Sequence, residues 1–179
     1  MAERENATDA VDHRQARYRE LAYSRFTIQP DDVFVFLVTY GRYESSAKAL
    51  GWVDQLKDGE ELRVCFKKVA DAVNGGFERL VSAEPALLAA VRYFYKTPPL
   101  RQVWGHDQAE WRAVPRSETG MLRTLLDLSQ ARNNLFHGGK GWSELECRDR
   151  DRAVVAHGLT ILCAIIASNA DLTEKFEAY

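Results

Sequence analysis

Apolar residues recur at intervals of three and four positions along most of the chain, whereas the strict alternation typical of β-strands is rare. Such spacing places apolar side chains on one face of an α-helix. We therefore expect an all-α fold, an up-and-down helical bundle of four to five core helices preceded by an N-terminal helix. The helices are predicted over residues 8–24, 31–50, 60–74, 85–96, 117–137 and 147–168, with a further helical turn over 77–81.

Glycine and proline mark the expected ends of these helices. Gly51 follows the second helix, Gly75-Gly76 is expected to close the third, and Pro98-Pro99 to terminate the fourth. The resulting domain organisation is an N-terminal helical extension (1–29), a helical bundle (30–170) and a C-terminal tail (171–179).

Residues 97–116, TPPLRQVWGHDQAEWRAVPR, are the least regular part of the chain. They predict a long aromatic-rich loop inserted into the bundle, and loops of this length tend to be functional. The favoured interpretation is that Trp104 and Trp111 pin the loop to the core. The alternative is that the two indoles stack on nucleic-acid bases.

The composition narrows the class of protein. At 179 residues the chain suits one domain, and its net charge of −2 gives no global basic field, so any nucleic-acid binding requires a local patch. Cys65, Cys147 and Cys163 have no metal-site or disulfide spacing, and we expect reduced core thiols in a cytoplasmic protein. No apolar run is long enough to span a bilayer, and no cofactor or metal motif is present, so neither a membrane nor a cofactor is expected.

The helix predicted over 117–137 carries a charged residue on its apolar stripe. Arg132 continues the stripe formed by Met121, Leu125 and Leu128. A guanidinium keeps its charge, so its partial burial requires an acceptor such as a carboxylate or a phosphate. Glu44 occupies an equivalent position on the apolar face of the helix over 31–50, which predicts an Arg132–Glu44 ion pair between the two helices.

Polar residues after Arg132 suggest chemistry at the end of the same helix. A five-residue step separates Arg132 and His137 by about 140° around the axis, whereas Asn133 and His137 lie about 40° apart. The two groups at 132 and 137 can cooperate only if the helix ends nearby or a second copy of the motif lies alongside. Gly138-Gly139 would supply the helix end, and Lys140 adds a cation. Together these residues suit a phosphodiester site, with cations for the phosphate and an imidazole for proton transfer.

The Arg-x4-His spacing occurs three times, at Arg101/His106, Arg132/His137 and Arg152/His157. The first lies in the irregular segment. The third lies in an otherwise apolar helix, where His157 is expected to be a core histidine. Only the second combines a polar residue after the arginine with a helix stop after the histidine, so it is the candidate site.

The string RNNLFHGGK at 132–140 resembles the Arg-x4–6-His motif of HEPN domains, and residues 33–52 are similar to the first long helix of HEPN-like proteins. The resemblance implies a HEPN-like helical bundle that dimerises, so that two motifs share one cleft. Catalytic members cleave RNA without a metal, by attack of the 2′-OH on the neighbouring phosphorus, and many are toxins or antiviral-defence effectors. RNA, a second copy of the chain and a cognate inhibitor protein are the partners implied.

By position, the resemblance gives Arg132 the role of stabilising phosphate charge, His137 that of general acid or base, and Asn133 that of orienting one of them. Helical geometry and local charge add Glu44 as a supporting residue and Lys140 for phosphate binding. Asn134 is also expected to contact phosphate or RNA. Three functions stay open: a metal-independent endoribonuclease, a non-catalytic module that binds RNA, nucleotide or a partner protein, and a structural role in which Arg132–Glu44 is a buried strut.

Overall fold

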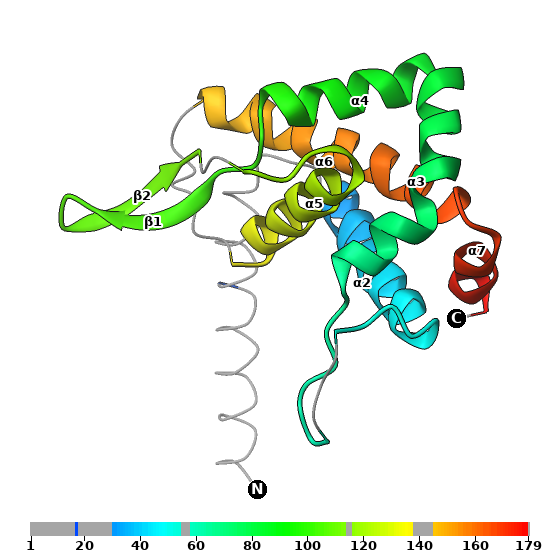
Figure 1. Ribbon diagram of the computed structural model, residues 1–179. Coiled ribbons are helices and arrows are strands. Elements are labelled where there is room, and N and C mark those ends of the chain that lie inside the picture. Colours follow the sequence, from blue (N-terminus) through cyan, green and yellow to red (C-terminus); the bar gives the residue numbers. More distant parts are fainter. Residues whose placement is uncertain (1–16, 18–29, 55–57, 114–115, 138–144, 179) are drawn as a thin grey trace, which may run out of the picture.

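The computed structural model describes residues 17, 30–54, 58–113, 116–137 and 145–178. Within these residues the chain is mostly helical, which confirms the predicted all-α class (Figure 1). The predicted N-terminal helix over 8–24 lies outside the described residues except for Arg17. The described elements are α2 (Pro30–Ala49), α3 (Phe66–Ala83), α4 (Pro85–Lys96), β1 (Arg101–Gly105), β2 (Gln108–Arg112), α5 (Gly120–His137), α6 (Leu145–Ala167) and α7 (Ala170–Glu177).

Helix α6 lies at the centre of the bundle, as its wide apolar face predicts. It packs against α2 and α4, and its residues Ile161, Leu162 and Ile165 are fully buried. Gly158 allows this packing, because a Cβ there would lie 2.9 Å from the ring of Phe36. The buried face of α2 is aromatic, with Phe36, Tyr40 and Tyr43 in the core.

The segment expected to be a C-terminal tail contributes a helix to the bundle. Helix α7 packs against α2, and Leu172 is completely buried. The guanidinium of Arg42 lies 4.5 Å from the ring centre of Phe176 and donates a hydrogen bond to the carbonyl of the same residue. The Asn169 side chain caps α7 by accepting from the backbone N–H of Leu172.

The prediction for the third helix is wrong at both ends. Residues 58–65 are turns and extended backbone, with an antiparallel bridge between Val53 and Val64, and the helix begins only at Phe66. It then continues through Gly75-Gly76 to Ala83. A Cβ on Gly76 would lie 2.8 Å from the carbonyl carbon of Ser168 and closer still to its oxygen. The glycine therefore permits close approach of α3 to the end of α6 and is not a helix stop.

The two adjacent glycines give a matched stability test. We expect Gly76→Ala to destabilise the fold by about 1–3 kcal/mol, because the new methyl group meets a backbone carbonyl that cannot move without shifting the end of α6. Gly75→Ala is the control. Its Cβ would meet only the end of the Arg79 side chain at 3.9 Å, so we expect up to about 1 kcal/mol of stabilisation from the better helix former. Urea unfolding measures both, and equal effects would contradict the packing described here.

The predicted irregular loop at 97–116 contains a β-hairpin. Strands β1 and β2 pair in antiparallel register, with Gln102 opposite Trp111 and Val103 opposite Glu110. His106 and Asp107 both have positive φ, of 49° and 59°, which is the conformation of a two-residue turn whose twist suits a hairpin. The hairpin projects from the side of the bundle (Figure 1).

The predicted role of the tryptophans in pinning this segment is wrong for Trp104. Its side chain is 75% exposed, whereas Trp111 is half-buried. Position along the hairpin accounts for the difference, because Trp104 lies next to the tip, whereas Trp111 pairs with Gln102 near the base. Trp104 stands on the face opposite to Val103.

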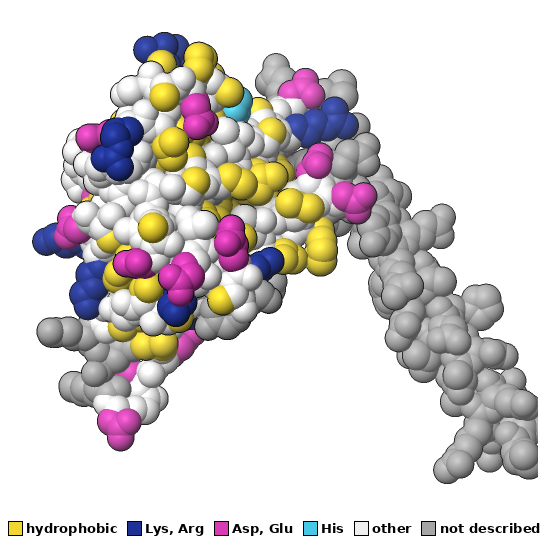
Figure 2. Space-filling view, turned by 90° about the vertical axis from the view of Figure 1, so that its right-hand side faces the viewer, with side chains coloured by type: hydrophobic (Ala, Val, Ile, Leu, Met, Phe, Trp, Pro, Cys, Tyr) yellow, Lys and Arg dark blue, Asp and Glu magenta, His cyan; other side chains and the backbone are white. Residues whose placement is uncertain are grey.

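The structure also bears on the expectations for charge, cysteines and membrane spans that were drawn from the composition. Positive and negative side chains are interspersed on the face shown in Figure 2, so that face carries no broad basic field. Cys163 is exposed and Cys65 half-buried, which corrects the prediction that they are core thiols; the Cys147 side chain lies outside the described part.

Among the described helices, none alone is long and apolar enough to cross a membrane; α6 and α7 meet that criterion only as a pair bent by 109°.

Candidate active site at the end of helix α5

The predicted ion pair between helices α5 and α2 is present. The Nη2 atom of Arg132 lies 3.5 Å from Oε2 of Glu44 and donates a hydrogen bond to it. Their side chains are 36% and 26% exposed, respectively. The pair therefore joins the two helices at a partly exposed position and is not sealed in the core.

An aromatic ring lies beneath the same guanidinium. The Arg132 Cζ atom is 5.7 Å from the ring centre of Tyr40, within the range of a cation–π contact. Tyr40 is fully buried, and burial raises the pKa of its phenol well above the ordinary value. The side chain of Ser129 lowers the Tyr40 pKa, Glu44 raises it and Arg132 lowers it, but burial dominates. Tyr40 therefore remains neutral and presents an uncharged ring to the cation.

Asn133 makes the contact expected of an orienting residue. The Nη1 atom of Arg132 donates a hydrogen bond of 2.9 Å to Oδ1 of Asn133. Together with the Glu44 contact, this fixes two of the guanidinium nitrogens on different partners. Arg132 is consequently held in a defined position at the surface, which is the arrangement that a phosphate-binding arginine needs.

The prediction that Asn134 binds phosphate or RNA is not supported by its position. Asn134 is buried and both ends of its amide have protein partners: Oδ1 accepts from Gln130 and Nδ2 donates to the carbonyl of Leu100. Arg101 in turn donates to the Gln130 side chain. These bonds fasten the base of the hairpin to α5. The role of Asn134 is therefore to position the hairpin.

The remaining predicted site residues fall at or beyond the edge of the described part. His137 is the last residue of α5, and its side chain lies outside the described part of the chain. Lys140 and the pair Gly138-Gly139 also lie outside it. The structure thus brings together Arg132, Asn133 and Glu44, and it places the backbone of His137 little more than one helical turn further along.

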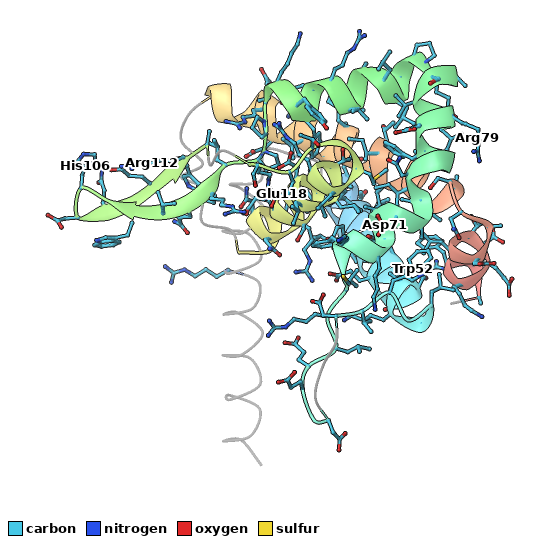
Figure 3. The ribbon with its side chains drawn as sticks, viewed as in Figure 1. Trp52, Asp71, Arg79, His106, Arg112 and Glu118 are labelled. Carbon is cyan, nitrogen blue, oxygen red and sulfur yellow. The ribbon has the colours of Figure 1, made fainter. Side chains whose placement is uncertain are left out.

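The two other Arg-x4-His matches occupy different settings. His106 lies at the hairpin tip, where its Nδ1 is 2.7 Å from Glu110, and Arg112 contacts the same carboxylate (Figure 3). These two partners lower the pKa of Glu110. His157 is half-buried and packs on Tyr93, with 4.6 Å between ring centres. In neither match is the arginine followed by an asparagine, as Arg132 is followed by Asn133.

A buried charge cluster at the start of α5 was not predicted. Arg116 donates through Nε to Oδ1 of Asp127 and through Nη2 to the carbonyl of Leu126. The Nε atom of Arg123 lies 3.5 Å from the other carboxylate oxygen of Asp127. The side chains of Asp127 and Arg116 are only 1% and 9% exposed. The sequence signal is an acidic residue among the buried positions of α5, one residue before Leu128.

Tyr43 gives a test of the buried aromatic layer behind the site. Its hydroxyl has no hydrogen-bond partner among the described residues, and burial raises its pKa well above the ordinary value, with smaller contributions from Tyr40 and Glu44. The unfolded chain therefore ionises this phenol first, near pH 10, so folding stability falls as the pH rises above that value. We expect Tyr43→Phe to weaken this alkaline loss and to change stability at neutral pH by less than about 1 kcal/mol. Urea unfolding at neutral pH and above about pH 10 tests this, and an unchanged loss of stability at the alkaline pH would contradict it.

No family model matches the chain, and neither a curated protein nor a solved structure does so. In the part of the chain that the structure describes, no group of three His, Cys, Asp or Glu side chains is placed to hold a metal ion.

Proposed function

We propose that the chain is a metal-independent endoribonuclease of the HEPN type, acting as a homodimer. The observation that supports this most is the fixed position of Arg132. Asn133 and Glu44 hold its guanidinium at an accessible surface, close in sequence to the helix-terminal His137. A cation can stabilise the phosphate charge and an imidazole can transfer the protons of phosphodiester cleavage without a metal, and the amide orients the cation.

In the proposed reaction the ribose 2′-OH attacks the adjacent phosphorus, the bond from phosphorus to the 5′-oxygen breaks, and a 2′,3′-cyclic phosphate and a 5′-OH result. Arg132 binds the non-bridging phosphate oxygens, whose negative charge increases in the transition state. His137 transfers a proton, either from the 2′-OH or to the leaving 5′-oxygen. Asn133 keeps Arg132 in position, and Lys140 adds positive charge for the phosphate.

Glu44 has a supporting role in this scheme. It attracts Arg132 in the absence of RNA, and the distance of 3.5 Å makes that contact weaker than a close, charge-assisted hydrogen bond. A phosphate can therefore compete for the guanidinium. Glu44 then keeps the arginine near its working position without binding it too tightly to act.

The homodimer supplies the second proton-transfer group. Positions 132 and 137 are about 140° apart around the axis of a regular helix, so the proposal calls for two copies related by a two-fold axis to complete the cleft. Helix α2, which carries Glu44, also exposes three large apolar side chains, Phe34, Val35 and Val38. These are a suitable apolar surface for the second copy, since exposed apolar patches often mark interfaces.

RNA cleavage of this kind suggests a toxin or antiviral-defence effector, which would work in the cytoplasm and would require a cognate inhibitor protein. The alternative is a non-catalytic module that binds RNA, nucleotide or a partner protein. The exposed Trp104 of the hairpin is the observation that favours binding. Both functions use Arg132 for phosphate, and they differ in whether His137 transfers a proton.

The experiment that distinguishes them is incubation of the purified full-length chain with RNA in excess chelator, together with sedimentation analysis. The proposal predicts multiple turnover and a mass of twice 20.3 kDa. Binding of RNA with no product after long incubation would favour the module. Cleavage by a monomer would contradict the shared cleft.

A further inference from the structure

The hairpin formed by β1 and β2 has two chemically different faces. Residues that are directly opposite in antiparallel strands lie on the same face. Gln102, Trp104 and Trp111 therefore share one face, which we call the tryptophan face. The other face carries Glu110 with Arg112, and the tip carries His106 (Figure 3).

The tryptophan face is exposed and contains no acidic residue. Trp104 is 75% exposed, Gln102 is exposed, and Trp111 is half-buried on the diagonal from Trp104. An indole ring with a neighbouring amide can stack on a base and hydrogen-bond to its edge. The aliphatic residue of this strand, Val103, lies on the other face, so the apolar part of the tryptophan face consists of its two indoles.

The opposite face stiffens the hairpin. Arg112 is within hydrogen-bond distance of Glu110 through both Nε and Nη2, and His106 contacts the other oxygen of the same carboxylate. A Cβ on Gly105 would collide with the Arg112 guanidinium, so that side chain packs directly over the strand. The negative charge of Glu110 is therefore directed away from the tryptophan face and is offset by its two partners.

The base of the hairpin is fastened to the helix that carries the candidate active site. Arg101 donates to Gln130, and Asn134 donates to the carbonyl of Leu100, so both anchors lie within one helical turn of Arg132. Trp104 is three residues along the strand from Arg101, which places its backbone roughly 10 Å from the anchor. An RNA strand bound at Arg132 needs only a few nucleotides to reach Trp104.

We propose that Trp104 stacks on an unpaired base of the RNA substrate, a few nucleotides from the phosphate held by Arg132, and that the enzyme therefore selects single-stranded RNA. This inference rests on the proposed function, in which Arg132 binds a phosphate of the same RNA strand. A base inside a duplex has both faces covered by its neighbours and cannot stack on a side chain. The hairpin thus defines the class of RNA, and the motif on α5 defines the chemistry.

The test measures RNA affinity with the full-length chain carrying His137→Ala, which prevents turnover. The probes are a short single-stranded RNA and a blunt duplex of the same sequence. We expect Trp104→Ala to weaken binding of the single strand by about 5- to 100-fold, the range for loss of one stacked base. Trp104→Phe should retain most of the affinity, and duplex binding should not change. Leu62→Ala, at an exposed apolar residue of the segment before α3, is the control.

Failure of this inference and failure of the proposed function give different results. If the chain cleaves RNA but Trp104→Ala leaves single-strand affinity unchanged or weakens duplex binding equally, the stacking role is overturned and the nuclease stands. If Trp104→Ala weakens binding of the single strand but the chain without any substitution yields no cleavage product, the stacking role stands and the catalytic proposal is overturned.

Discussion

Replacing Arg132 or His137 by alanine should reduce RNA cleavage by at least about 100-fold. Loss of one group that stabilises transition-state charge typically lowers the rate about 10²- to 10³-fold, and loss of a general acid or base about 10²- to 10⁴-fold. The measurement is single-turnover cleavage of a single-stranded RNA in chelator. Arg132→Lys should also be impaired, because an ammonium lacks the planar fork that contacts both Asn133 and Glu44.

These variants should remain folded, which separates catalysis from stability. The Arg132–Glu44 pair is partly exposed and 3.5 Å long, so its loss should cost no more than about 1 kcal/mol. Arg79→Ala is the matched control, since Arg79 is an exposed arginine on α3, on the side of the molecule away from the hairpin (Figure 3). A large loss of stability in Arg132→Ala would favour the structural strut, and full activity would exclude Arg132 from the reaction.

Asp127→Ala should give the largest loss of stability among single substitutions of charged residues, about 3–5 kcal/mol. The substitution leaves the guanidinium of Arg116 buried without its carboxylate and removes the partner of Arg123. For a chain of this size, the loss corresponds to a decrease of roughly 6–20 °C in Tm. Thermal unfolding and urea titration measure it.

Two further variants serve as controls for Asp127→Ala. Asp71→Ala removes an exposed aspartate of α3 and should change stability by less than about 0.5 kcal/mol. Replacing both partners, with Arg116→Met and Asp127→Leu, should recover much of the loss because no orphaned charge remains in the interior. A small effect of Asp127→Ala, similar to that of Asp71→Ala, would contradict the buried cluster.

The helix periodicity predicted the parts of the fold that depend on local sequence. Helices α2 and α4 have nearly the predicted bounds, because an apolar stripe, Pro85 and the glycine or proline that follows each helix all act locally. The Arg132–Glu44 contact was predictable for a related reason. Arg132 and Glu44 each interrupt the apolar face of their own helix. Because apolar helix faces pack against one another, the two charged side chains were expected to come together.

Features that depend on distant partners could not be predicted in the same way. The glycine pair in α3 has the sequence of a helix stop, and only the carbonyl of Ser168 against Gly76 gives it another role. Strand β1 is short and requires β2 to form, so no local pattern distinguished it from a loop.

Contacts with distant partners also limited what could be predicted about the candidate site. Asn134 was expected to bind phosphate or RNA, but the carbonyl of Leu100 holds its amide in the interior. The partner of Asp127 comes from the segment before α5, outside any helical periodicity. Helix periodicity therefore predicted the contact of Arg132 with Glu44, whereas nothing in the local sequence predicted the partners of Asn134.

The most direct test of the account is the identity of the RNA ends produced by the purified chain in chelator. Cleavage by attack of the 2′-OH predicts a 2′,3′-cyclic phosphate on one product and a 5′-OH on the other, with neither formed by Arg132→Ala or His137→Ala. Products ending in a 3′-OH and a 5′-phosphate, or the same products from all three proteins, would contradict it.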